Sequence, residues 1–183
     1  LSKCRQVHAH SRACAHDIGP ADSLGNLSMK IDCILAQGIR CYENIFYDGA
    51  ISPSFISDSI AKHSTNFNIG GHSIFLGQVR ADYVENQQVK CIEYSANQEL
   101  ALQLMFEIRE SIFEKFDLTC MHVHHSLGKV ATGEICLFVF TSSTHRLAAI
   151  EACSEIVERI KRELPIWGKE ILNDENYIWK VNK

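Results

Sequence analysis

The sequence lacks the patterns that mark several common protein classes. No apolar run approaches the ~20 residues that a helix needs to cross a bilayer, and the opening LSKCRQVHAH has no apolar core of a secretory signal. A net charge of −4 with a pI near 6.1 argues against a protein built to coat nucleic acid. The chain also contains no GxSxG elbow, no P-loop and no GxGxxG motif. We therefore expect neither nucleic acid nor a membrane as a partner.

The eight cysteines do not have the clustered, loop-based spacing of a secreted disulfide scaffold. Several lie inside apolar runs, such as Cys136 in EICLFVF and Cys153 in AIEACSEIV. These positions predict small buried thiols in a reducing compartment, and hence a cytoplasmic protein. The 183 residues, 46% of them hydrophobic, suit one globular domain that carries an additional arm.

The first 28 residues differ from the rest of the chain. They show no hydrophobic period and hold three histidines and two cysteines, which are His8, His10, His16, Cys4 and Cys14. We expect residues 1–28 to be a disordered extension, Met29 to be the natural start, and 29–183 to form the domain.

Hydrophobic periodicity after Met29 predicts alternating strands and helices. Residues 97–116 show one apolar helical face, and residues 134–141 are so apolar that they predict a central strand buried on both faces. Gly128 and Gly133 indicate a turn before that strand. The expected elements, in order, are two short strands and a helix from Ser52-Pro53 to about His63 within 30–63, a strand at 73–80, a polar hairpin at 81–88, a strand at 89–95, a helix at 97–116, strands at 119–125 and 134–141, a helix from Ser143-Thr144 to Glu163, and a short strand at 177–179. This order describes an α+β, two-layer sandwich with helices packed on one face of a mostly antiparallel sheet.

Three basic clusters are candidates for anion chemistry. Arg80 leaves a strand just after a glycine, and its fork of donors suits a phosphate or a carboxylate. His145 and Arg146 follow at the expected start of the second long helix, where free N–H groups also attract anions. Lys161 and Lys169 flank Pro165-Ile166-Trp167, where a desolvated lysine could move protons. Taken singly, each cluster could equally be a solvated strand end, a capped helix start or a charge that compensates the helix dipole.

Histidine and cysteine form the fourth candidate cluster. His122 and His124 lie two residues apart on one expected strand and so face the same side, as a metal pair would. No second pair stands at zinc-finger spacing, and in strands such residues are commonly packed or surface side chains. We therefore predict no metal site and no cofactor.

Four ordered segments resemble one family. SIFLGQVR is similar to the FxGxVR signature of the large, catalytic subunit of molybdopterin synthase, and CIEYSA matches the strand that follows it. MHVHHSLGKVATGE resembles the family's HHRxGxLxxGE turn, and TSSTHRLAAIEACSEIVERIKRELPIWGKE resembles its SxHRxxAFxACxxxxDxLKxxxPIWKKE segment. The likeness extends from about Gly70 to Trp179 and implies the hammerhead-like fold of that subunit.

The resemblance implies a sulfurtransferase that converts cyclic pyranopterin monophosphate to molybdopterin without a metal. The sulfur would come from the thiocarboxylate on the C-terminal Gly-Gly of a small ubiquitin-like subunit. Two large subunits would form a central homodimer, and one small subunit at each end would complete a heterotetramer. A binding or regulatory member of the same fold, without catalytic activity, is the alternative.

The resemblance also assigns roles to individual residues. Lys161 and Lys169 are the expected catalytic residues. The expected substrate-binding residues are Phe75, Gln78, Val79, Arg80, His145, Arg146, Lys161, Gly168, Lys169 and Glu170. Gly168 departs from the family, which usually has a lysine directly after this tryptophan, and Gln78 stands where lysine or threonine is common. Either Lys169 replaces the missing amine, or the enzyme relies on Lys161 alone.

Helix geometry adds a prediction about assembly. Arg146 and Lys161 lie fifteen residues apart on one expected helix, which separates them by roughly 22 Å. A small pterin does not span that distance. We therefore expect each active site to combine Lys161 of one subunit with His145 and Arg146 of the other.

Overall fold

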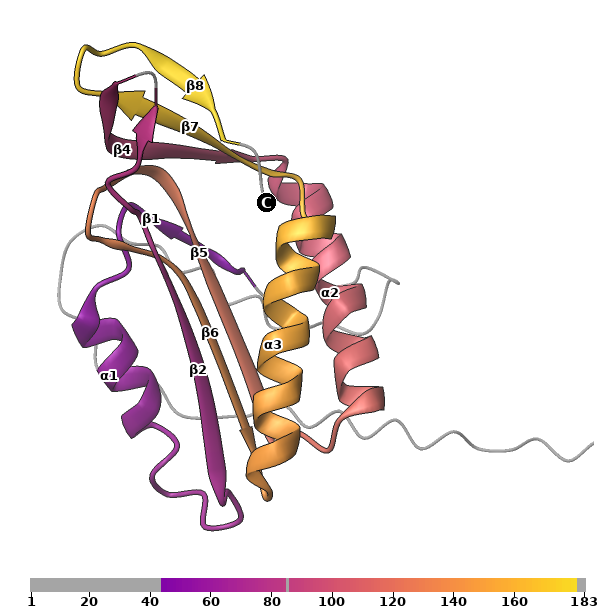
Figure 1. Cartoon of the computed structure of the whole chain (residues 1–183). Helices are drawn as coiled ribbons and strands as arrows, with labels where there is room; N and C mark the ends of the chain where they lie inside the picture. Colours follow the sequence, from indigo (N-terminus) through magenta and orange to yellow (C-terminus); the bar gives the residue numbers. More distant parts are fainter. Residues whose placement is uncertain (1–43, 85, 181–183) are drawn as a thin grey trace, which may run out of the picture.

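A computed structural model describes residues 44–84 and 86–180. The predicted extension at 1–28 and the strand-like run at 30–36 lie outside these residues. Within them, three helices and eight strands follow one another in the order that Figure 1 shows, with the two long helices side by side.

Local signals in the sequence place the three helices. α1 (Pro53–Ala61) begins as predicted, because the Ser52 hydroxyl accepts a hydrogen bond from the backbone N–H of Phe55 at 3.2 Å. Asn97 caps α2 (Gln98–Lys115) in the same way. α3 (Arg146–Glu163) ends before Leu164 because Pro165 disfavours a helical conformation at the residue before it.

The strands form one mostly antiparallel sheet, as predicted. Its order is β2-β6-β5-β4-β7-β8, while β3 pairs with β4, and β1 pairs in parallel with β5. The strands are β1 (Phe46–Asp48), β2 (Gly71–Gln78), β3 (Tyr83–Val84), β4 (Gln87–Ala96), β5 (Cys120–Ala131), β6 (Ile135–Ser143), β7 (Ile166–Leu172) and β8 (Tyr177–Trp179). β7 occupies a segment for which the sequence predicted no element.

β5 changes partner along its length. Residues 120–125 pair with β6, whereas residues 128–131 pair with β4. Gly128, with φ of +74°, lies inside β5 where the pairing with β4 begins, so its predicted place in a turn is wrong, while Gly133 does lie in the turn. As a result, β4, β7 and β8 lie across one end of the long strands (Figure 1).

The core lies on both faces of the sheet because β6 is apolar at successive positions. Leu137 and Val139 face the main core with α2 and α3, whereas Phe138 and Phe140 pack with Ile56 of α1. The two long helices therefore share one face, as predicted, and the short α1 covers the opposite face. β6 is buried on both sides, which confirms its predicted central place.

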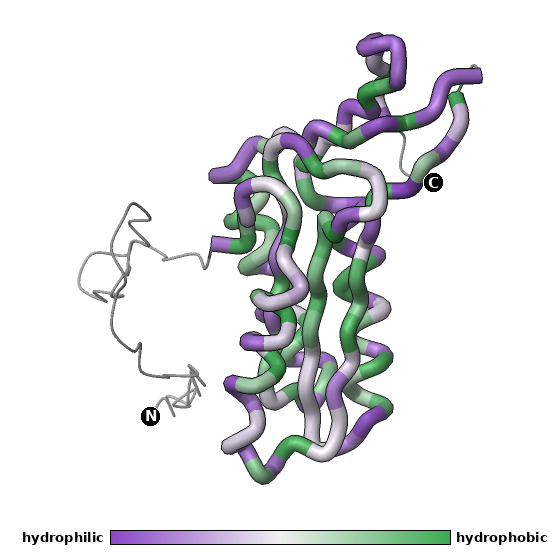
Figure 2. The backbone as a smooth tube through the Cα atoms, turned by 90° about the vertical axis from the view of Figure 1, so that its left-hand side faces the viewer, coloured by the Kyte–Doolittle hydropathy of each residue, from purple (hydrophilic) through white to green (hydrophobic). Residues whose placement is uncertain are grey.

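Hydropathy varies from segment to segment along the chain. The long strands are mostly hydrophobic, and the turn between β7 and β8 is hydrophilic (Figure 2). Cys120, Cys136 and Cys153 are buried free thiols, as predicted. Within 44–84 and 86–180, no helix has both the length and the apolar content needed to cross a membrane.

Candidate functional site

The packing of α3 on β2 brings two of the predicted site residues, Lys161 and Phe75, together. Lys161, in the last turn of α3, holds its amine 5.7 Å from the centre of the Phe75 ring on β2. Phe75 itself packs against the main core, so the ring is fixed. A cation at this distance from an aromatic face is stabilised by the ring quadrupole. The contact places Lys161 over β2, the first strand in the sheet order.

A buried thiol lies beside this contact. Cys136 on β6 donates a hydrogen bond to the Gly77 carbonyl at 3.4 Å, and burial raises the pKa of its thiol. The positive charges of Lys180 and Lys161 act against this rise in pKa. Two lysines from distant segments thus contribute to the electrostatics of one buried thiol.

Gly168 on β7 leaves room for one of these lysines. A Cβ at this glycine would lie 3.4 Å from Cδ of Lys180 and 3.1 Å from a methyl group of Ile92. The backbone N–H of Lys180 donates to the Gly168 carbonyl at 2.8 Å, so the two residues are held side by side. The amine of Lys180 lies 3.5 Å from the Glu170 carboxylate. The stem of Lys180 therefore passes alongside Gly168.

Lys169 lies on the other face of β7. Its amine is 3.9 Å from the Glu93 carboxylate and 4.0 Å from the centre of the Tyr177 ring. Because successive side chains of a strand point to opposite faces, Lys169 does not share the face of Gly168 and Glu170. The structure thus brings Gly168 and Glu170 beside Lys180, whereas Lys169 contacts Glu93 and Tyr177 instead.

Sequence reasoning missed Lys180 because the resemblance ended at Trp179. The signal that could have found it is strand register. β8 pairs Trp179 with Lys169, so the next residue along the chain falls opposite Gly168. Without a prediction of β7, that pairing was not visible.

The other predicted anion residues lie at the two ends of β2 and α3. Gln78 is the last residue of β2, where the pairing has a bulge, and it is exposed. Val79 is buried, and its backbone N–H donates a hydrogen bond to the Glu134 carbonyl. Arg80 follows with an exposed side chain that forms an ion pair with Asp82 at 2.8 Å. A surface pair of this kind contributes little to stability, so the guanidinium can exchange partners.

His145 and Arg146 begin α3. His145 is the N-cap, so the predicted caps Ser143 and Thr144 are wrong by one or two positions. Ser143 ends β6 instead, and its hydroxyl donates to the Asp117 carbonyl at 2.6 Å. His145 makes no side-chain cap bond, so its ring does not satisfy the first-turn N–H groups. Both side chains are exposed, at the opposite end of α3 from Lys161.

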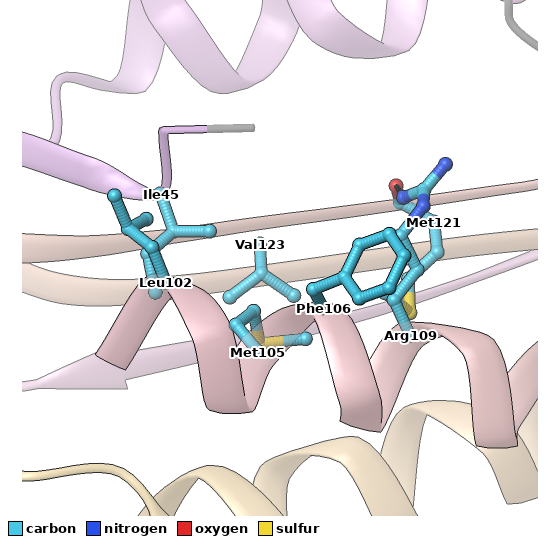
Figure 3. A pocket seen from close by; sticks show the side chains of 7 residues that line it. All are labelled: Ile45, Leu102, Met105, Phe106, Arg109, Met121 and Val123. Carbon is cyan, nitrogen blue, oxygen red and sulfur yellow. Dashed lines mark hydrogen bonds between the residues drawn. The ribbon is translucent and has the colours of Figure 1, made fainter. Parts of the chain in front are cut away.

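One apolar hollow lies on α2 and β5, away from these groups. The residues that line it are Ile45, Leu102, Met105, Phe106, Arg109, Met121 and Val123, as Figure 3 shows. Arg109 donates to the Met121 carbonyl at 3.1 Å and its guanidinium lies 4.9 Å from the centre of the Phe113 ring. The hollow contains none of the predicted site residues and offers core packing rather than chemistry.

The predicted histidine pair divides between two environments. His122 and His124 both face the α1 side, and burial lowers the pKa of each to about 4. The ring of His124 packs edge-on against Phe55, whereas His122 lies within 3.1 Å of His63. The structure therefore groups His122 with a histidine from another element rather than with His124.

Comparison with known proteins identifies the family. The family described as MoaE protein matches residues 51–163. The chain belongs to the MoaE protein family. This confirms the resemblance carried by the four sequence segments.

Individual MoaE relatives support the same assignment. A molybdopterin synthase catalytic subunit from Pyrococcus abyssi is 35% identical over 124 residues, which are 68% of this chain and 82% of the relative. The relative of that name from Bacillus subtilis is 33% identical over 118 residues, or 64% of this chain and 74% of its own length. The human relative is 35% identical over 114 residues, and the match spans 62% of this chain and 60% of the human protein.

Solved structures share the MoaE fold. Molybdopterin synthase from Staphylococcus aureus superposes with a TM-score of 0.66 at 26% identity and covers 79% of this chain and 99% of its own. A complex of subunits 1 and 2 of molybdopterin-converting factor from Helicobacter pylori gives a TM-score of 0.65 at 18% identity, with 75% and 90% covered, which shows the fold alone. The predicted α+β architecture is therefore confirmed.

Proposed function

We propose that this MoaE protein is the catalytic subunit of a molybdopterin synthase. The reaction is the transfer of sulfur from the C-terminal thiocarboxylate of a small Gly-Gly subunit to cyclic pyranopterin monophosphate. The family match and the relatives named as this subunit support the activity. The observation that carries the site is the placement of two amines, with Lys161 over the Phe75 ring at 5.7 Å and Lys180 at 3.5 Å from the buried carboxylate of Glu170. Both positive charges also act on the Cys136 thiol.

Both partners in this reaction are anions, and the site supplies fixed cations for them. Lys161 binds the thiocarboxylate and moves protons as the cyclic phosphate opens. The sulfur forms a bond to a substrate carbon as a carbon–oxygen bond at that carbon breaks, and the small subunit is then held as a thioester. Water cleaves the acyl–sulfur bond, which leaves the sulfur on the substrate and releases the small subunit as a carboxylate. Lys180 takes the place of the amine that Gly168 lacks. Positioned cations of this kind stabilise developing negative charge in a partly dry site.

The role predicted for Lys169 stays a prediction, and its contacts with Glu93 and Tyr177 do not favour it. Phe75 and Glu170 hold the two lysines, while Gln78, Val79 and Arg80 form the strand end that faces the phosphate. Gly168 provides the space that the Lys180 stem uses.

The proposal requires two copies of the chain. Arg146 is the first residue of α3 and Lys161 lies fifteen residues further along the same helix, so roughly 22 Å separates them. We propose that His145 and Arg146 of one subunit complete the site that holds Lys161 of the other. A homodimer with one small subunit at each end, in the cytoplasm, fits this arrangement and the buried free thiols.

Measured synthesis of molybdopterin tests the proposal. Wild-type protein, thiocarboxylated small subunit and cyclic pyranopterin monophosphate should yield molybdopterin, and Lys161→Ala should abolish it. Arg162→Ala is the matched control, because Arg162 lies in the same helical turn and forms only an exposed ion pair with Glu163. An inactive wild-type protein that still binds the small subunit would favour the alternative of a non-catalytic member of the fold.

A further inference from the structure

Three side chains that commonly bind metals converge at the end of α1. Nε2 of His63 lies 3.0 Å from Sγ of Cys120 and 3.1 Å from Nε2 of His122. All three ligand atoms lie within 4.8 Å of one another. His63 follows α1, whereas Cys120 and His122 are alternate residues of β5 and so face the same side. The cluster joins two elements that are far apart in sequence.

A backbone carbonyl fixes the tautomer of His63. Nδ1 of this ring lies 2.7 Å from the carbonyl oxygen of Ser59. Because a carbonyl can only accept, Nδ1 carries the proton and Nε2 presents a lone pair to Cys120 and His122. Metal-binding histidines commonly have this arrangement, in which the far nitrogen donates to a carbonyl and orients the ring.

An apolar wall lies beneath the cluster. The Phe140 ring is fully buried, its centre is 4.9 Å from that of His63, and it stacks on His122 at 5.8 Å. Cys120 is itself only 4% exposed. An apolar wall limits water and strengthens the attraction between a cation and its ligands. His72, with an exposed ring centred 6.1 Å from that of His63, borders the open side.

We propose that His63, Cys120 and His122 form a zinc site with water as the fourth ligand. Tetrahedral zinc with Zn–N near 2.0–2.1 Å and Zn–S near 2.3 Å requires ligand separations of roughly 3.3 Å for two nitrogens and roughly 3.6 Å for nitrogen and sulfur. The two separations that involve His63, 3.1 Å to nitrogen and 3.0 Å to sulfur, are shorter than these values by about 0.2 Å and about 0.6 Å. Binding of the ion therefore requires rotations that move the three ligand atoms slightly apart.

Binding changes the protonation of one ligand. The Cys120 thiol loses its proton to solvent and becomes a thiolate, while the two imidazoles bind in their neutral form. The dipositive ion and the single thiolate give the site one net positive charge. No oxidation or reduction takes place.

The zinc site is separate from the proposed sulfur-transfer site. The cluster lies on the sheet face that α1 covers, next to Phe140, whereas Lys161 belongs to α3 on the opposite face. The ion connects the end of α1 to β5 and so stabilises the smaller core. The inference does not depend on the reaction assigned to the protein.

Cobalt substitution tests the site directly. Full-length protein freed of metal with a chelator and titrated with Co²⁺ should bind one equivalent, with the visible bands of tetrahedral cobalt and a near-ultraviolet thiolate-to-cobalt band. Zn²⁺ should displace the cobalt and raise the melting temperature. Cys120→Ser should remove the thiolate band, and His63→Gln and His122→Gln should each weaken binding by about 100-fold or more.

The matched controls are a buried thiol on α3 and a second histidine on β5. Cys153→Ser removes a thiol that is also 4% exposed, and His124→Gln alters the next residue on the same face of β5. Both should bind cobalt like the wild type. Circular dichroism without metal verifies that every variant is folded, and His63→Gln leaves the buried thiol in place. A cobalt spectrum that persists in Cys120→Ser and His122→Gln would overturn the proposal, because the ion would then belong to other histidines or cysteines of the chain.

Discussion

The amine of Lys180 lies 3.5 Å from the carboxylate of Glu170, a residue of β7 that is only 9% exposed. The Lys180 side chain is 32% exposed, so solvent screens the pair only in part. The backbone hydrogen bond from the Lys180 N–H to the Gly168 carbonyl is a second contact that holds this lysine in place. A residue just beyond the last strand is thus directed toward the site that holds Lys161.

Replacing Lys180 should separate the two candidates for the second amine. Lys180→Ala should lower the rate of molybdopterin formation by about 10²–10⁴-fold, the range typical of losing a proton-transfer group. Lys169→Ala should change it by only a few-fold, because Lys169 faces Glu93 and Tyr177. Single-turnover assays with thiocarboxylated small subunit measure both rates. A larger loss of rate in Lys169→Ala than in Lys180→Ala would instead assign the catalytic role to Lys169.

A lysine moved to position 168 should rescue the Lys180 variant. The stem of Lys180 occupies space beside the Gly168 backbone, so removing it makes room for a side chain there. The double variant Gly168→Lys/Lys180→Ala should recover much of the activity that Lys180→Ala loses. Gly168→Lys alone should be less stable than the double variant. In both, the new Cβ meets Ile92 at 3.1 Å, but only in the single variant does the new side chain also meet the Lys180 stem, at 3.4 Å from its Cδ. Failure of the rescue in a folded double variant would show that Lys180 acts elsewhere.

Mixing two inactive variants should restore activity if sites are shared between subunits. Arg146→Ala and Lys161→Ala each remove one half of every site. With random exchange, half of the dimers are mixed and one of their two sites is intact, so about a quarter of wild-type activity should return. Activity is measured after refolding the two proteins together. Mixtures that stay as inactive as their components would place both residues in one subunit's site.

The free energy of unfolding should fall at acidic pH because of His125. This ring is 9% exposed and packs against Tyr94, and burial lowers its pKa although a bond to the Ser126 carbonyl opposes the shift. In the unfolded chain the ring binds a proton below about pH 6.5, but in the fold it stays neutral to lower pH. The folded state is therefore fully stabilised above about pH 6.5 and loses up to about 1.4 kcal/mol per pH unit below it.

Replacement of His125 tests this pH dependence. Urea denaturation of wild-type protein and His125→Gln between pH 8 and pH 5 should give curves that run parallel above about pH 6.5 and diverge below it. The wild type should lose stability faster, because only it takes up this proton on unfolding. Parallel curves across the whole range would contradict the assignment.

Local sequence patterns predicted most of the fold. Ser52-Pro53 located the start of α1, the 3.6-residue apolar period located α2, and the leucine before Pro165 ended α3. These signals act within a few residues, so a sequence displays them directly. β7 was missed because its alternation is interrupted by Gly168 and begins directly after a helix. Gly128 was misplaced because a glycine with positive φ serves a turn and a bend inside a strand equally well.

The site was predictable only where a motif carried it. Lys161 and Phe75 meet as their motifs suggested, since α3 packs on β2. Lys180 and the His63 cluster depend on pairings between distant strands and on where α1 ends, and no local pattern records these. His63 stood at the end of a predicted helix with no reason to associate it with Cys120.

The change of partner along β5 makes this strand the connection between two groups of strands. In the described part of the chain, β4, β7 and β8 join the ladder of the remaining strands through β5 alone. Glu170 and Gly168 belong to that group, whereas Phe75 and Cys136 belong to the other. A change in backbone angle at Gly128 would therefore change the distance between Lys180, which is bound to β7, and Lys161 on α3. A protein that binds to β4, β7 and β8 could therefore change the distance between the two amines without contacting either of them.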